Sequence, residues 1–89
     1  MRTVHHTSVY KRSFKKYKMS GQFPAEKLFR CIELLANDTA LPISYQDHSL
    51  RGKLSLFREC HIASNILLIY KKDDEFLKLI NLGSHDDLF

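Results

Sequence analysis

No stretch of this 89-residue sequence approaches the roughly 20 consecutive apolar residues that a membrane-spanning helix needs. The first ten residues, MRTVHHTSVY, also lack the apolar core of a signal peptide. These two absences argue against a membrane protein and against a secreted one. We therefore expect a cytoplasmic protein that has no membrane partner.

Cysteine is scarce as well. The sequence has only Cys31 and Cys60, and without a secretion signal we interpret them as reduced thiols in the core, not as a disulfide. Five histidines are present, but the spacing of His48, His61 and His85 matches no familiar zinc signature. A chain this short also leaves little room for a bound cofactor. We expect neither a metal nor another cofactor.

Acidic residues are nearly absent from the first third of the chain. Residues 1–30 carry eight Lys or Arg against the single Glu26, a net charge of +7, whereas residues 31–60 and 61–89 sum to −1 and −2. A one-sided basic segment suits a polyanion such as RNA, because each Lys or Arg beside a phosphate releases counterions. A solvated helix face would carry the same charge, so charge alone does not decide between the two interpretations.

The first half of the chain predicts a strand followed by two helices. Residues 2–9, RTVHHTSV, are rich in Thr and Val and show no helical period, which favours a strand. From Tyr10 to Tyr17 aromatic residues recur at helical spacing with basic residues between them, which indicates an amphipathic helix. Gly21 ends that helix, and Pro24 suits the first turn of the next one. The second helix has apolar residues at helical spacing: Ala25, Leu28, Phe29, Ile32 and Leu35.

The second half predicts an antiparallel meander. ISYQDHSLRGKLS has no sustained period and is interpreted as a connection, in which Gly52 permits a turn. The runs SLFRECHI, ILLIY and FLKLINL then alternate with the short turns ASN and KKDDE. We therefore predict a single α+β domain over residues 1–89. It has a small antiparallel sheet of about four strands, an N-terminal helical hairpin on one face and a short C-terminal helical turn.

In the strand around residues 54–62, a period of two divides the side chains between the two faces. Since the helical hairpin must cover one face of the sheet, the other face is left for function. One face is expected to hold Leu54, Leu56, Arg58, Cys60 and Ile62, and the other Phe57, Glu59 and His61.

The last nine residues, NLGSHDDLF, predict an anchored histidine. The chain turns out of the last strand at the glycine, and one helical turn follows. Ser84 and Asp87 form a capping pattern for that turn, with aspartates at its positive end. Leu88 and Phe89 would tuck the turn back onto the domain. His85 would then be fixed near the edge of the sheet.

Cleavage of RNA by its own 2′-hydroxyl needs a base, an acid and a cation near the phosphate. Histidine can serve either proton step, and Arg58 offers a fork of donors to phosphate oxygens. Ideal alternation, however, puts Arg58 and His61 on opposite faces, so both reach one site only through a bulge or bend. From the residues alone, without comparison to a known family, RNA cleavage is one hypothesis among several.

The segments YQDHSLRG, FRECHI, ILLIY and LGSHDDLF occur in an order and at a spacing that resembles the YafQ family of the RelE/ParE toxin superfamily. The resemblance covers roughly residues 8–89. It implies an endoribonuclease of a type II toxin–antitoxin system that cuts translated messenger RNA on the ribosome by metal-independent acid/base catalysis. It also implies a cognate ribbon-helix-helix antitoxin of the DinJ type, in a heterotetrameric complex with a toxin that is monomeric when free.

The resemblance also implies the site residues. His48, His61 and His85 match the family's catalytic histidines, with His85 as general acid, and Glu59 matches an acidic residue beside them. Asn65 stands where the family commonly has an acidic residue, and Asn81 where it has an arginine. Either Arg58 and a lysine compensate, or the activity is weak or altered. The residues expected to contact RNA or phosphate are Arg58, Lys53, Asn65, Asn81, Phe89, Lys15, Lys16 and Lys18.

Two other classes of function stay open at this point. One is a non-nucleolytic toxin like the ParE branch of the superfamily. The other is an RNA- or ribosome-binding protein that has lost catalysis and acts through its basic helix alone.

Overall fold

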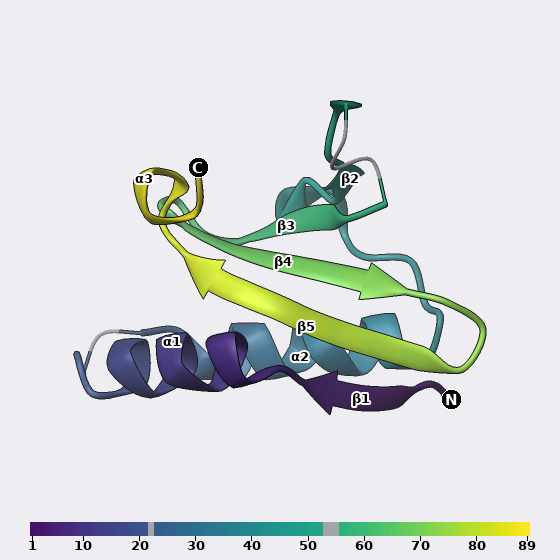
Figure 1. Cartoon of the computed structure of the whole chain (residues 1–89), viewed down its shortest axis with the longest axis horizontal. Helices are drawn as coiled ribbons and strands as arrows, with labels where there is room; N and C mark the ends of the chain where they lie inside the picture. Colours follow the sequence, from purple (N-terminus) through teal and green to yellow (C-terminus); the bar gives the residue numbers. More distant parts are fainter. Residues whose placement is uncertain (22, 53–55) are drawn as a thin grey trace.

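The computed structural model describes residues 1–21, 23–52 and 56–89. It confirms the predicted α+β class, with two N-terminal helices, a mostly antiparallel sheet and a short final helix (Figure 1). The elements in chain order are β1 (Thr3–His6), α1 (Ser8–Lys18), α2 (Ala25–Ala36), the 3₁₀ turn η1 (Ile43–Tyr45), β2 (His48–Ser49), β3 (Arg58–Ala63), β4 (Ile66–Lys72), β5 (Phe76–Gly83) and α3 (His85–Leu88).

The sheet has the strand order β1-β5-β4-β3-β2. Its centre is the predicted antiparallel meander of β3, β4 and β5. Two features differ from the prediction of about four antiparallel strands. The N-terminal strand β1 pairs parallel to β5, because the two helices intervene before the chain returns to the sheet. A fifth strand, β2, lies in the segment interpreted as a connection and pairs antiparallel with β3.

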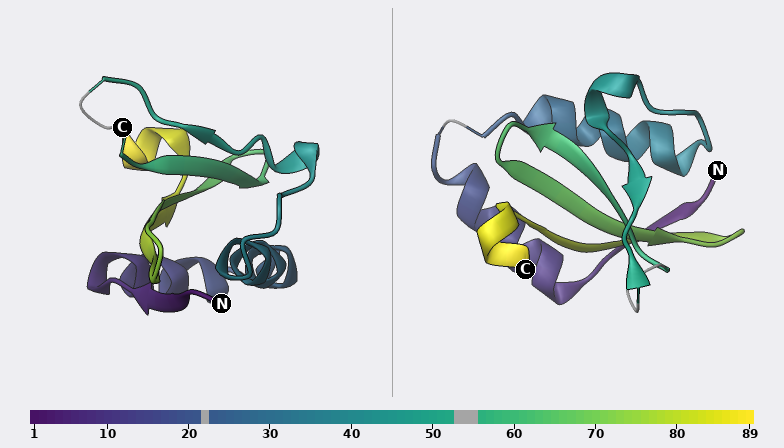
Figure 2. Two further views of the ribbon diagram at one scale, coloured as in Figure 1. Left: turned by 90° about the vertical axis from the view of Figure 1, so that its right-hand side faces the viewer. Right: turned by 90° about the horizontal axis from the view of Figure 1, so that it is seen from above.

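The helices α1 and α2 lie on one side of the sheet, whereas α3 lies on the other side, at the end of β5 (Figures 1 and 2). The core fills the space between the two long helices and the sheet. Burying a Leu or Ile side chain fully contributes about 1.5–3 kcal/mol, so this layer supplies most of the stability. The largest fully buried side chains are Tyr70, Leu28, Ile62, Leu68, Leu77, Leu79, Leu82, Cys31 and Cys60.

Both cysteines are reduced core thiols, as predicted. Cys31 of α2 and Cys60 of β3 are fully buried, with their Sγ atoms 3.3 Å apart. The predicted apolar face of α2 is partly wrong. Phe29, which is predicted to lie on that face, is 53% exposed, and Cys31 is buried in the core. No helix in the described part of the chain is long and apolar enough to cross a membrane.

The start of α1 is fixed to β5 by Thr7. Its Oγ1 accepts a hydrogen bond from the Tyr10 amide at 3.2 Å, which caps the helix, and donates to the Leu79 carbonyl at 2.7 Å. The helix ends with three exposed lysines, Lys15, Lys16 and Lys18, in its last turn. Cations in this position are stabilised by the helix dipole.

We expect Thr7→Ala to lower the free energy of unfolding by about 1 kcal/mol or more, because it removes both the cap and the bond to β5. Thr7→Ser keeps the hydroxyl and is the matched control. Urea denaturation monitored by circular dichroism measures both variants. Equal destabilisation of the two would contradict a role for the hydroxyl.

Candidate active site

The candidate site lies on the sheet face that α1 and α2 leave uncovered. Along β3, Cys60 and Ile62 turn into the core, whereas Glu59 and His61 turn to the opposite face, as the predicted alternation requires. Strand β2 adds His48 to this face, because the register pairs His48 with Glu59.

His48 forms two polar contacts. Its Nε2 lies 2.8 Å from Glu59 Oε1, and its Nδ1 lies 2.6 Å from the Gln46 carbonyl oxygen. Both partner atoms are hydrogen-bond acceptors, so both ring nitrogens of His48 are engaged. Glu59 is only 8% exposed, and within the described part of the chain its Oε2 has no partner. A buried carboxylate oxygen with an open acceptor position is suited to receive a donor from a substrate.

His61 lies next to this pair, with its ring centroid 6.3 Å from that of His48. It also lines a hollow of about 360 Å³ together with residues of α2, η1 and the end of β3. One of those residues is Lys27, whose ammonium group lies 5.1 Å from the centroid of the Tyr45 ring. The sequence analysis missed Lys27, because nothing in PAEKLF distinguishes it from any lysine on a solvated helix.

His85 is the first residue of α3, and the predicted cap is present. Ser84 Oγ accepts from the Asp87 amide at 3.1 Å. The return bond of a capping box is replaced by Tyr17 of α1, whose hydroxyl accepts from the Ser84 amide at 3.2 Å and donates to Asp87 Oδ2 at 3.1 Å. The bond from Tyr17 and that from Ser84 lower the pKa of the Asp87 carboxyl.

The last two residues behave differently from each other. Leu88 is half-buried and packs against Gly83, where an added Cβ would lie 3.4 Å from its side chain. Phe89 is 54% exposed, so the prediction that it tucks onto the domain is only partly correct. Its ring instead lies edge-on to His85, with the centroids 5.0 Å apart.

An apolar hollow of about 240 Å³ lies between α3 and the sheet. Ile69 is part of its lining and pairs with Glu59 in the sheet, so the hollow extends from the end of α3 toward the His48–Glu59 pair. The hollow is lined by Leu50, Phe57, Ile69, Ile80, Asn81, Leu88 and Phe89.

Arg58 does not join the histidines. It lies on the helix-facing side, where its Nη2 pairs with Asp47 at 3.2 Å and its Nε donates to the Tyr70 hydroxyl at 3.2 Å. The register shift of β3 falls between His61 and Ala63, beyond the stretch from Arg58 to His61. It therefore does not turn the Arg58 side chain to the face of His61. Arg58 and His61 thus lie on opposite faces, as ideal alternation predicted, and the bend that would bring both to one site is not present between them.

The other predicted contact residues are scattered. Asn81 lines the apolar hollow, and its Oδ1 accepts from Ser13 Oγ at 2.9 Å. Asn65 is exposed in the turn between β3 and β4. Lys53 lies outside the described residues. The lysines of α1 are exposed, at the end of α1 that Tyr17 ties to α3.

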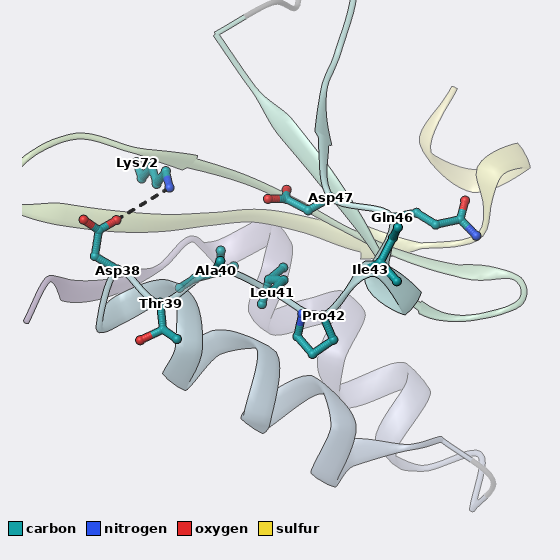
Figure 3. A pocket seen from close by; sticks show the side chains of 10 residues that line it. Asp38, Thr39, Ala40, Leu41, Pro42, Ile43, Gln46, Asp47 and Lys72 are labelled. Carbon is teal, nitrogen blue, oxygen red and sulfur yellow. Dashed lines mark ion pairs between the residues drawn. The ribbon is translucent and has the colours of Figure 1, made fainter.

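A further hollow of about 550 Å³ is not part of this cluster (Figure 3). It is formed by the segment after α2 together with Gln46, Asp47 and Lys72, and no histidine lines it. The cluster of His48, Glu59 and His61 therefore lies apart from this hollow.

A sequence model of the family described as "Bacterial toxin of type II toxin-antitoxin system, YafQ" matches residues 2–89. The chain belongs to the YafQ family. The chain is 39% identical over 64 residues to the mRNA interferase toxin YafQ of Escherichia coli K12, a match covering 71% of this chain and 70% of the relative. It is 41% identical over 63 residues to a putative toxin YafQ of Haemophilus influenzae, covering 66% and 62%.

Solved structures agree with this family. A copper-bound mutant toxin from Helicobacter pylori superposes with a TM-score of 0.94 at 35% identity, covering 100% of both chains. A chain of the E. coli DinJ–YafQ complex superposes with a TM-score of 0.90 at 28% identity, covering 100% of this chain and 99% of the other. The resemblance inferred from the four sequence segments is thus confirmed for family and fold.

The bond between Tyr17 and Asp87 is directly testable by titration. The pKa of Asp87 is lower in the fold than in the unfolded chain, where it is about 3.9. Its carboxylate therefore stabilises the fold above that pH, and the contribution is lost as the pH falls through the folded pKa. We expect Tyr17→Phe to return the Asp87 pKa toward its ordinary value, as measured by carbon-detected NMR.

Asp38 serves as the internal control for this titration. Its pKa is lowered by a hydrogen bond from Arg2 and is expected not to change in Tyr17→Phe. An unchanged Asp87 titration in that variant would contradict the link between α1 and α3.

Proposed function

We propose that this YafQ-family chain is an endoribonuclease that cleaves messenger RNA on the ribosome and is held inactive by a DinJ-like ribbon-helix-helix antitoxin. The observation that carries the proposal is the gathering of His48, Glu59 and His61 on the uncovered face. His85 contacts Phe89, which lines the apolar hollow beside this face. The E. coli relative is named as an mRNA interferase toxin, and the DinJ–YafQ complex supports the choice of partner.

The geometry suits a reaction with two proton transfers. On the β3 side, His61 acts as the base that takes the proton of the 2′-hydroxyl as its oxygen attacks the adjacent phosphorus, and the neighbouring His48–Glu59 pair orients the attacking group. His85 gives a proton to the departing 5′ oxygen as the P–O bond breaks. The products are a 2′,3′-cyclic phosphate and a free 5′-hydroxyl, and no metal is required.

The apolar hollow is proposed to receive a nucleobase. Its lining offers the apolar surface on which an unstacked base can pack, and Phe89 presents an exposed aromatic ring at its edge. Base stacking on an aromatic side chain is worth about 1–3 kcal/mol. Phe89 would therefore place the base while His85, in contact with the same ring, stands at the phosphate.

Among the described residues, the cations that the sequence predicted do not join the histidine cluster. Asn81 provides no cation, and Arg58 is engaged on the other face. Lys27 stands in the hollow beside His61, and the lysines of α1 are exposed for contact with ribosomal RNA. We propose that this distribution makes cleavage depend on the ribosome, which holds the RNA in place. The exposed lysines also favour the second candidate, an RNA-binding protein without catalysis.

We expect His85→Ala to lower the rate of cleavage of ribosome-bound messenger RNA by about 100-fold or more, since a positioned proton donor contributes that much. Mapping of RNA 5′ ends in a purified translation system measures it. His5→Ala, which changes an exposed histidine on β1, is the control. Full cleavage by His85→Ala with intact antitoxin binding would instead support the non-catalytic candidate.

We expect Lys27→Met to raise KM about 10-fold while kcat changes little, because a hydrogen bond to a charged group is lost on RNA binding. Lys78→Met removes an exposed lysine of β5 and serves as the control. Equal KM values for the two variants would exclude Lys27 from RNA binding.

Metal independence is tested on the toxin alone. Metal-bound toxin structures exist from Helicobacter pylori, but both proton transfers proposed here use histidine. We expect toxin dialysed against a chelator, then added to ribosomes in magnesium buffer, to cleave at the untreated rate. Activity that is lost on dialysis and restored by added copper or zinc would contradict this.

A further inference from the structure

The segment that carries His48 has little backbone support. Strand β2 consists of His48 and Ser49 alone, at the edge of the sheet. Gln46, just before it, has a φ of +49°, in the left-handed region that a residue with a side chain seldom adopts. The Gln46 amide donates to the Ile43 carbonyl at 2.9 Å, and the Leu50 amide donates to the Phe57 carbonyl at 2.9 Å. Side chains add to these backbone bonds between the two points, at Asp47 and His48.

Asp47 supplies such contacts on the helix-facing side. Its Oδ2 lies 3.2 Å from Arg58 Nη2, and its Oδ1 accepts hydrogen bonds from Arg58 Nε and from the Tyr70 hydroxyl. Tyr70 is fully buried in the central strand β4, and Arg58 begins β3. The carboxylate is therefore anchored to two inner strands of the sheet, β3 and β4.

Asp47 and His48 are adjacent and point to opposite faces. On one face Asp47 is held by Arg58 and Tyr70, and on the other His48 pairs with Glu59 at 2.8 Å. We propose that Asp47, anchored by Arg58 and Tyr70, is a positioning residue that holds the backbone of His48 so that its imidazole meets Glu59. The catalytic consequence rests on the proposed function, whereas the positioning itself does not.

The electrostatics of the cluster agree with this role. Burial and the bond to Asp47 raise the pKa of Tyr70, so its hydroxyl stays a proton donor. Removing the carboxylate would leave the Arg58 guanidinium, only 35% exposed, and the buried Tyr70 hydroxyl without their acceptor. Arg58, predicted to bind phosphate, thus has a defined task on the opposite face.

The experiment compares three variants. Asp47→Ala removes the anchor, Asp47→Asn keeps an oxygen that accepts from Tyr70, and Tyr70→Phe removes one donor while keeping the buried ring. Asp38→Ala is the control, since it breaks an arginine pair, to Arg2 at 2.9 Å, that does not touch β2. Imidazole ¹⁵N shifts of the free protein report the state of each histidine, and ribosome-dependent cleavage gives kcat and KM.

We expect Asp47→Ala to move the His48 nitrogen shifts toward those of a solvent-exposed imidazole, with His85 unchanged, and to lower kcat at least 10-fold with KM within twofold. Asp47→Asn recovers part of both effects, and Tyr70→Phe shows them more weakly. If Asp47→Ala does not fold, Tyr70→Phe alone decides.

His48 shifts that stay as in wild type in Asp47→Ala, or in a folded Tyr70→Phe, would overturn the proposal. Shifts that move without any loss of kcat would confirm the positioning and overturn the catalytic role of His48 in the proposed function. The two failures are therefore distinguishable.

Discussion

The alternation of side chains along β3, in a sheet covered on one face only, is the constraint on which the rest of the structure depends. Cys60 and Ile62 are fully buried beneath the helices, and this fixes Glu59 and His61 on the uncovered face. A shift of one residue in register would exchange the two sets. The same alternation along β3 thus buries the core side chains and places the candidate site residues on the uncovered face.

The two faces divide the polar groups by task. On the uncovered face, the buried Oε2 of Glu59 has no partner among the described residues, which is costly unless a substrate completes it, and His85 is exposed to solvent. On the covered face, Asp47, Arg58 and Tyr70 satisfy one another. The three groups on the covered face bond to one another, whereas on the uncovered face Glu59 Oε2 stays available to a substrate.

Sequence reasoning succeeded where the signal is local. Period-two alternation placed Glu59 and His61 on one face, and the pair Ser84 and Asp87 predicted the final helical turn. It failed where a contact joins distant segments. A two-residue strand such as β2 is too short to show a period, and the parallel pairing of β1 depends on how two helices return the chain. The role of Tyr17 in holding α3 had no signal, because it depends on packing across 70 residues.

The central claim is that the uncovered face directs attack of a 2′-hydroxyl on the adjacent phosphate. The chemistry of the RNA ends tests it most directly. Cleaved messenger RNA from a purified translation system is treated with polynucleotide kinase, with and without ATP, before adaptor ligation and sequencing. The account predicts 5′-hydroxyl ends that ligate only after phosphorylation, together with 2′,3′-cyclic phosphates. Fragments that carry 5′-phosphates before treatment would contradict it.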